Sequence, residues 1–152
     1  MLTKDHVICI RKTDYSETSQ IVTFLGKDTG KFSAIAKGAK RKKNSFGGVI
    51  EIFSTGDVVF SQSQTAKLAN LAEFNQKPSF IYLRSNLHSL NCGLFAAELI
   101  DKFTQEHCKE SGMFEAFEAF LCEVQTCSKA SEALAFLIVF QMALLNINGS
   151  LP

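Results

Sequence analysis

The sequence predicts a two-part fold, β then α: a small closed β-barrel over residues 1–77 followed by an α-helical domain over residues 78–152. Short segments rich in β-branched and aromatic residues fill the first half, and the apolar residues take up a helical period after Pro78. Charge divides at the same place, because residues 1–77 hold twelve Lys or Arg against seven Asp or Glu, whereas residues 78–152 hold four against eight. The basic half is therefore expected to face a polyanion.

Four short segments of the first half are strand candidates, separated by clusters of Gly, Ser, Asp and Thr: residues 7–10, 20–25, 31–36 and 57–60. Residues 49–53 and 67–74 are further candidates, so five or six strands fit within this half. Within residues 31–36 the side chains alternate, with Phe32, Ala34 and Ala36 on one face and Lys31, Ser33 and Ile35 on the other. This number of strands is typical of a small closed barrel.

The second half predicts three helices. Two apolar stripes mark the first pair, with Gly112 between them: Leu83, Leu87, Leu90 and Leu94, then Phe114, Phe117, Leu121 and Val124. Ser128 is the expected N-cap of a third helix over about 129–146, which is apolar all round its axis. Such a helix belongs at the centre of a bundle, so we expect further chain after Pro152, or another molecule, to cover it.

Composition narrows the class to a soluble globular protein, with 46% hydrophobic and 20% charged residues. Five scattered cysteines without a C-x-x-C pair favour free, mostly buried thiols in a reducing compartment over a metal site. We expect no export, because the N-terminus lacks a signal-peptide core, and no membrane span, because the apolar run 133–145 is too short. The expected location is the cytoplasm, in association with the nucleoid.

The basic loop, defined here as residues 37–43, places five cations within seven residues: Lys37, Lys40, Arg41, Lys42 and Lys43. Crowded cations repel one another, whereas a nucleic acid strand supplies phosphates at regular spacing. Neutralising about five phosphates of a single strand makes affinity fall roughly a hundredfold between 50 and 200 mM salt. The alternative is a solvated surface loop, but nearby glycines permit close backbone approach and Phe46 offers a ring for base stacking.

Other residues of the first half are candidates to extend this DNA-binding patch: Arg11, Lys12, Lys27 and Lys31. Each alone is more typical of an ordinary surface charge. Tyr15 and Phe24 are further candidates for stacking on bases, although Phe24 lies in an apolar segment and is more typical of a core residue.

No catalytic set, metal site or cofactor site is expected. The three histidines, His6, His88 and His107, fall in different segments with no nucleophile beside them. Asp14 and Glu17 resemble a carboxylate pair, but in a turn Asp14, Ser16 and Thr18 more commonly hydrogen-bond their own backbone. Glycine-rich phosphate-binding signatures are missing. We therefore expect a binding protein rather than an enzyme.

Several motifs, in order and at matching spacing, resemble the N-terminal region of the RecO family of bacterial recombination mediators. They are Asp14-Tyr15-Ser16-Glu17-Thr18-Ser19, Ile21-Val22-Thr23, Gly30-Lys31, Ala36-Lys37-Gly38-Ala39-Lys40-Arg41 and Ser45-Phe46. Leu144-Leu145, Gly149 and Pro152 resemble the family's LL-x-x-x-G-x-x-P segment. The resemblance implies an OB-fold, here a five-stranded barrel, joined to a helical domain.

The same resemblance implies a role. RecO proteins bind single- and double-stranded DNA, anneal complementary strands, contact the C-terminal tail of single-strand-binding protein, and work with RecR to load the RecA recombinase. Two departures stand out. Ile52 occupies a position where the family often has proline, and the chain ends before the four-cysteine zinc site that many relatives carry. We therefore expect a truncated chain or a shortened relative.

Three hypotheses follow. In the first, a non-enzymatic DNA-repair mediator holds the phosphate backbone with the basic loop, and its helical half contacts protein partners. In the second, the chain is an adaptor that does not bind DNA and whose basic loop docks an acidic partner. The third is an enzyme such as a nuclease, but no cluster of Asp, Glu or His suited to a metal is evident.

Overall fold

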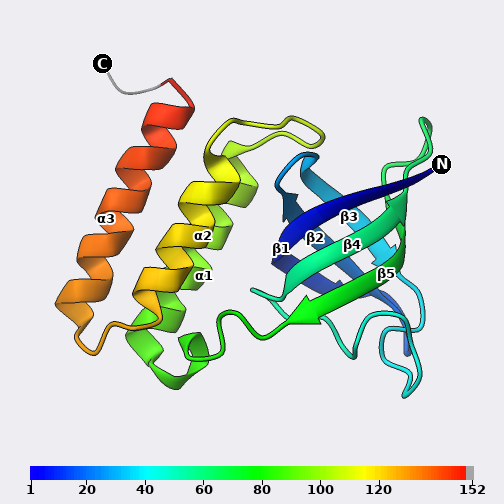
Figure 1. Cartoon of the computed structure of the whole chain (residues 1–152), viewed down its shortest axis with the longest axis horizontal. Coiled ribbons are helices and arrows are strands. Elements are labelled where there is room, and N and C mark those ends of the chain that lie inside the picture. Colours follow the sequence, from blue (N-terminus) through cyan, green and yellow to red (C-terminus); the bar gives the residue numbers. More distant parts are fainter. Residues whose placement is uncertain (150–152) are drawn as a thin grey trace. The chain divides into compact units, whose positions relative to one another are not determined.

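Five strands close into a barrel in the computed structural model, which describes residues 1–149 (Figure 1). They are β1 (Leu2–Asp14), β2 (Gln20–Gly26), β3 (Gly30–Ala36), β4 (Thr55–Ser61) and β5 (Ala69–Lys77). Their order round the barrel is β1-β2-β3-β5-β4, and β4 closes it by pairing with β1. All neighbours are antiparallel except β3 and β5, whose parallel contact is confined to two residue pairs. The predicted fold class, an OB-fold barrel followed by helices, is confirmed.

The long strand β1 takes part in both halves of the sheet. Its first residues pair with β4 and its last residues pair with β2, and the register shifts between Cys9 and Arg11. A bulge of this kind bends a strand, which allows one strand to serve two neighbours in a small barrel. The barrel thus closes with few strands.

Phenylalanine rings fill the barrel. Phe32 stacks on Phe60 with centroids 4.3 Å apart, and Phe24 meets Phe74 edge-on at 5.3 Å. All four side chains are buried in one apolar cluster, so Phe24 is a core residue as the apolar segment indicates. Such aromatic contacts add to the stabilisation that comes from burying apolar area.

The predicted alternation of side chains in β3 is present, but burial is not confined to its apolar face. Its apolar face lies in the core, but Lys31 and Ser33 are also buried, at 9% and 5% exposure. Residues 104–109 pair with the edge of β3, where Glu106 forms a β-bridge with Lys31 and His107 N donates to Lys31 O at 2.7 Å. Ser33 Oγ also donates to Glu106 Oε1 at 3.3 Å. This returning segment belongs to the same compact unit as residues 1–78, although it follows the first α-helix, α1 (Leu87–Phe103), in the chain.

The second compact unit, residues 79–103 and 110 onward, is helical. It contains a short 3-10 helix η1 (Leu83–Ser85), α1 (Leu87–Phe103), α2 (Met113–Val124) and α3 (Ala130–Ile147). The predicted α2 stripe is buried, and Gly112 begins that helix at φ 85°, a left-handed conformation that favours glycine. The leucine stripe predicted for the first helix is correct only in part, because Leu83 is buried in η1 whereas Leu87 and Leu94 are exposed. The buried face of α1 is formed mainly by small residues.

Helix α3 differs from its prediction at its start, because its N-cap is Lys129 rather than Ser128, with no side-chain cap hydrogen bond. As expected, the rest of the described chain does not surround this helix, since one face is buried and the other is exposed. The buried face holds Ala133, Leu137, Phe140 and Leu144, and the exposed one Leu134, Ile138, Val139, Met142 and Leu145.

By length and composition α3 could also cross a membrane, since it extends beyond the apolar run 133–145 considered in the sequence. A single helix of this kind is weak evidence for a membrane span, because core helices of soluble proteins meet the same criteria.

The strand predicted over residues 49–53 is wrong. These residues form no strand in the structure but the last part of the connection into β4, with Ile50 and Phe53 buried.

Candidate nucleic-acid interface

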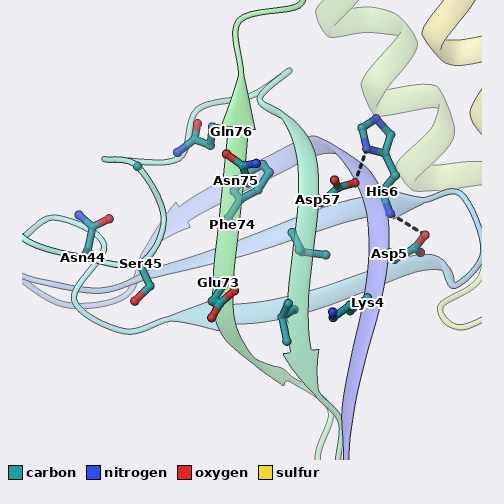
Figure 2. Close-up of a pocket in the computed structure, with 13 residues that line it drawn as sticks. Lys4, Asp5, His6, Asn44, Ser45, Asp57, Glu73, Phe74, Asn75 and Gln76 are labelled. Atoms are coloured by element: carbon teal, nitrogen blue, oxygen red, sulfur yellow. Dashed lines mark hydrogen bonds and ion pairs between the residues drawn. The ribbon is translucent and has the colours of Figure 1, made fainter.

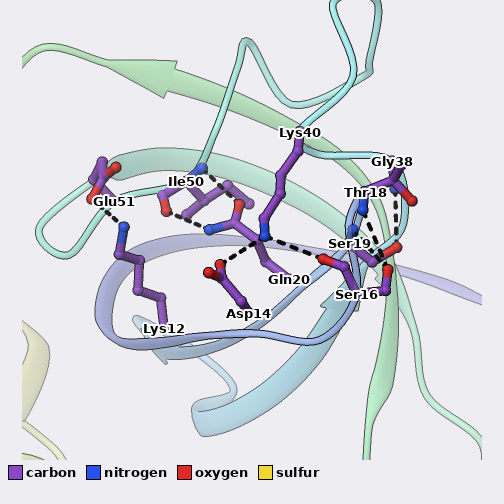
Figure 3. Close-up of polar contacts among 10 residues, drawn as sticks. All are labelled: Lys12, Asp14, Ser16, Thr18, Ser19, Gln20, Gly38, Lys40, Ile50 and Glu51. Atoms are coloured by element: carbon purple, nitrogen blue, oxygen red, sulfur yellow. Dashed lines mark hydrogen bonds and ion pairs between the residues drawn. The ribbon is translucent and has the colours of Figure 1, made fainter.

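Two loops leave the barrel at the same end. Strand pairing places Asp14, the last residue of β1, opposite Gln20, the first of β2, and Gln20 opposite Ala36, the last of β3. The turn of residues 15–19 and the β3–β4 connection of residues 37–54 therefore begin side by side (Figure 3). The basic loop is the first part of that connection. In OB-folds the connection between the first two strands commonly takes part in oligonucleotide binding.

The turn of residues 15–19 is organised by its own hydrogen bonds. The backbone N–H groups of Tyr15 and Ser16 donate to Ser19 O at 3.1 and 3.3 Å, and the Ser16 hydroxyl accepts from Thr18 N and Ser19 N at 3.3 and 3.2 Å. The expectation that Ser16 bonds its own backbone is confirmed. For Asp14 the corresponding expectation is wrong, because its carboxylate pairs with Lys40 at 3.0 Å.

The basic loop is fastened to this turn at three points (Figure 3). Gly38 N donates to Ser19 Oγ at 3.3 Å, and Lys40 N donates to Thr18 O at 3.1 Å. The Lys40 ammonium reaches both the Asp14 carboxylate at 3.0 Å and Ser16 O at 3.2 Å. Lys40 therefore holds two loops together, and its charge is offset within the protein.

Asn44 shapes the turn that follows. Its Nδ2 donates to Ala39 O at 3.1 Å and to Arg41 O at 2.8 Å, while its Oδ1 accepts from Phe46 N at 2.9 Å and Gly48 N at 3.2 Å. One amide side chain thus satisfies four backbone groups of the loop. Asn44 is not among the residues predicted from the sequence, although an asparagine between a charged run and two glycines is a typical turn signal.

Gln20 anchors the far end of the connection. Its side chain is fully buried, its Nε2 donates to Ile50 O at 3.0 Å, and its Oε1 accepts from Ile50 N at 3.0 Å (Figure 3). This paired arrangement satisfies the backbone of a residue that lies in no strand. Nothing local in the sequence indicated it, because a glutamine at the start of a strand is ordinarily a surface residue.

Four of the five cations of the basic loop are exposed: Lys37, Arg41, Lys42 and Lys43. Within residues 1–149, none of these four side chains forms an ion pair with a carboxylate. Their charges add to one another at one end of the barrel, and only solvent and ions screen them. The arrangement can therefore bind an extended polyanion.

The predicted extensions of the patch are not equivalent. Lys12 pairs with Glu51 at 2.5 Å, and Lys31 is buried where residues 104–109 pair with the edge of β3. Arg11 is exposed on the outer face of β1, where its Nη2 donates to Thr23 Oγ1 at 3.3 Å. Lys27 is exposed in the turn between β2 and β3, which opens at the other end of the barrel. The basic loop is thus the main concentration of exposed cations.

Phe46 requires a correction. Its ring is only 3% exposed and belongs to the barrel core, so in this structure it cannot stack on a base. The loop folds back so that Gln76 Nε2 donates to Phe46 O at 2.6 Å and Phe74 N donates to Ser45 O at 3.0 Å. Phe46 therefore secures the loop against β5.

A hollow of about 830 Å³ lies on the outer face of β1, β4 and β5 (Figure 2). Its charged lining is mixed, with Lys4 and the carboxylates of Asp5, Asp57 and Glu73, and His6 also lines it. His6 Nδ1 donates to Asp57 Oδ1 at 2.9 Å, and this hydrogen bond lowers the pKa of Asp57. Carboxylates at this hollow oppose phosphate binding, which distinguishes it from the basic loop.

The residues that the structure describes include no group of three His, Cys, Asp or Glu side chains placed to hold a metal ion.

Residues 1–80 match the family described as "Recombination protein O N terminal", and residues 84–152 match "Recombination protein O C terminal". The chain belongs to the RecO family. The family of DNA repair proteins that the sequence motifs indicated is thereby confirmed.

Similar proteins of known family agree with this assignment to the RecO family. The DNA repair protein RecO of Salinibacter ruber is 34% identical over 113 residues, which cover 74% of this chain and 44% of that protein. The proteins of the same name from Anaeromyxobacter sp. (strain K) and Bacillus subtilis are 28% and 29% identical, over 95% and 100% of this chain and 56% and 58% of theirs. The chain thus spans about half the length of these relatives. In the LL-x-x-x-G-x-x-P segment, Pro152 lies outside the described residues.

Proposed function

We propose that this RecO-family chain is a non-enzymatic DNA-repair and recombination mediator that binds single- and double-stranded DNA without sequence preference. The observation that carries the proposal is the group of four exposed cations, Lys37, Arg41, Lys42 and Lys43, held on an organised loop at one end of an OB-fold barrel. Phosphate contacts of this kind position a strand but do not read its bases. Binding should therefore depend on salt far more than on sequence.

Strand annealing follows from the same charges. Two complementary strands repel one another, and a protein that neutralises phosphates on both allows them to approach. No covalent step is required, so a catalytic group is not needed for this activity. The location that fits the role is the cytoplasm, at the nucleoid.

Protein partners are assigned to the chain on the family resemblance, namely RecR, the recombinase that is loaded, and the C-terminal tail of single-strand-binding protein. The helical unit offers one feature suited to a short peptide. A groove of about 280 Å³ between α2 and α3 is lined mainly by apolar side chains, among them Phe120, Phe136 and Val139. Grooves between helices bind short apolar segments by burying their side chains. We assign the tail of single-strand-binding protein to this groove.

The test is a salt titration of DNA binding in which the fluorescence anisotropy of labelled 30-mers reports the bound fraction. With about four phosphates neutralised, affinity for a single strand should fall about 50-fold between 50 and 200 mM salt, and affinity for a duplex about 150-fold. Polyglutamate serves as the competitor that distinguishes the adaptor hypothesis. An adaptor for acidic proteins would prefer polyglutamate, and absence of binding to either 30-mer at low salt would overturn the proposal.

A further inference from the structure

Beside the basic loop lies a hollow of about 390 Å³ whose chemistry is not that of phosphate binding alone. Tyr15 forms one part of its lining, Ile35 and Gly38 contribute apolar and backbone surface, and Lys37 and Arg41 provide two cations. The Tyr15 side chain is 62% exposed although it is large and largely apolar. An aromatic ring next to exposed cations is the combination that binds a base and its phosphates together.

We propose that Tyr15 stacks on an unpaired base of a single strand whose flanking phosphates are held by Lys37 and Arg41. This inference rests on the proposed function and adds a site that favours single strands over duplexes. In a duplex both faces of each base are covered by neighbouring base pairs, so the ring gains nothing from double-stranded DNA. Every base has a π-face, so the contact also keeps binding independent of sequence.

The position of Tyr15 is well defined, which a stacking platform requires. Its backbone N–H donates to Ser19 O at 3.1 Å, and Ser19 Oγ accepts from Gly38 N at 3.3 Å. The Lys40 ammonium adds a third tie through Asp14, the residue before Tyr15. The turn that carries the ring and the loop that carries the cations are therefore fastened to one another, so little ordering is needed when a strand binds.

The amino-acid composition allows a direct optical test. The chain has no tryptophan and only two tyrosines, Tyr15 and Tyr82, and both side chains are 62% exposed. In the Tyr82→Phe variant the tyrosine emission comes from Tyr15 alone. Binding of a 30-mer of thymidylate should quench this emission, because a stacked base deactivates the excited ring. An abasic 30-mer, which keeps the phosphates and lacks the bases, should bind without comparable quenching.

Affinities complete the test. Tyr15→Ala should weaken binding of the thymidylate 30-mer at least about fivefold, while Tyr15→Phe keeps the parent affinity. The same Tyr15→Ala change should leave the abasic strand and a 30-bp duplex within about twofold of the parent. Tyr82→Ala, a change at an equally exposed tyrosine of the helical unit, is the matched control and should bind like the parent.

The outcomes separate the two proposals. If the parent binds DNA with the expected salt dependence but Tyr15→Ala binds the thymidylate strand equally well, or the Tyr15 emission is unchanged, the stacking site is overturned and the proposed function stands. If the parent binds neither natural nor abasic strands at low salt, both are overturned. Equal loss of affinity for natural, abasic and duplex DNA in Tyr15→Ala would also contradict stacking, because it would indicate a disturbed loop.

Discussion

Lys40 and Arg41 are adjacent in the chain, yet their side chains have different roles. The Lys40 ammonium lies between the Asp14 carboxylate and Ser16 O, at 3.0 and 3.2 Å, so its charge is used inside the protein. The Arg41 side chain is exposed and lines the hollow beside Tyr15. A count of cations in the sequence treats the two residues alike, whereas only one of them is available to a phosphate.

This difference predicts distinct variants. Lys40→Ala should lower the free energy of unfolding by up to about 1 kcal/mol, because it removes a partly exposed ion pair between two loops, and should leave the salt dependence of DNA binding nearly unchanged. Arg41→Ala should leave stability within about 0.5 kcal/mol and reduce the salt slope for single strands by about 0.7. Urea unfolding and anisotropy titrations measure these quantities. The reverse pattern would mean that Lys40 binds DNA and Arg41 supports the fold.

The cysteines show how burial controls reactivity at the same scale. Burial raises the pKa of Cys9 to about 12, so its thiol stays protonated at pH 8 while the barrel is folded. Burial, reinforced by the carboxylates of Glu118 and Glu123, also raises the pKa of Cys122, although that side chain is exposed. Cys108 is exposed on the segment that lies along β3.

We expect iodoacetamide at pH 8 to alkylate Cys108 first, Cys122 more slowly, and Cys9 only after unfolding. Because the folded pKa of Cys9 lies above its unfolded value of 9.0, its contribution to stability is complete below pH 9 and is lost as the pH rises towards 12. Peptide mass spectrometry after timed alkylation measures the order. Alkylation of Cys9 as fast as Cys108 in the native chain would show that the barrel opens readily.

At the scale of elements, the β3–β4 connection is long but is not a loose loop. Residues 37–54 contain no strand or helix, yet Asn44 holds their first turn and Gln20 holds their end near Ile50. Phe46 and Ile50 are buried, so the connection also contributes to the barrel core. The exposed cations are thus presented from a fixed support, which reduces the ordering cost of binding.

Gln20→Leu tests this support. The substitution keeps the side-chain volume but leaves the backbone N–H and C=O of Ile50 without partners in a buried place, so the free energy of unfolding should fall by about 2 kcal/mol or more. The same substitution at Gln64, an exposed residue of the β4–β5 loop, should change it by no more than about 0.5 kcal/mol. Urea unfolding followed by circular dichroism gives both values. Equal stability of the two variants would mean that the anchor contributes nothing.

A second element, the groove between α2 and α3, leads to another prediction. Val139 lines the groove, while its neighbour Ile138 is exposed at 57% and lies outside the groove lining. Val139→Asp should weaken binding of a labelled peptide from the C-terminus of single-strand-binding protein at least tenfold, which is about 1.4 kcal/mol. The reason is that the bound peptide would bury the carboxylate introduced at position 139. Ile138→Asp should bind the peptide like the parent. Weakening in Ile138→Asp alone would place the peptide on another face of α3.

These elements show which features the sequence could predict. The barrel strands and the α2 stripe were predictable because their apolar residues recur at the period of a strand or a helix. The α1 stripe was not, because alanine and cysteine pack there while Leu87 is exposed. The basic loop was evident from local charge density. The Lys40–Asp14 pair was not evident, because it depends on strand register, and neither was the burial of Lys31 and Ser33, because residues 104–109 return to β3 from beyond α1.

At the scale of the whole molecule, the chain joins a basic barrel unit to an acidic helical unit within one RecO-family protein. The barrel unit supplies the exposed cations and the tyrosine, and the helical unit supplies an apolar groove. DNA binding and protein contact are thus assigned to separate units with different chemistry. The small net charge of +1 conceals this division, because the two halves largely cancel.

The most direct test of the account compares two triple variants by the salt dependence of single-strand binding. Arg41, Lys42 and Lys43 are changed to Ala in the first, and Lys4, Lys67 and Lys77, three exposed lysines of the same barrel unit, are changed to Ala in the control. Both variants lose the same net charge, so only the place of the charges differs. The slope of log affinity against log salt should become shallower by about 2 in the first variant and stay at the parent value in the control. Equal slopes in the two variants would contradict it.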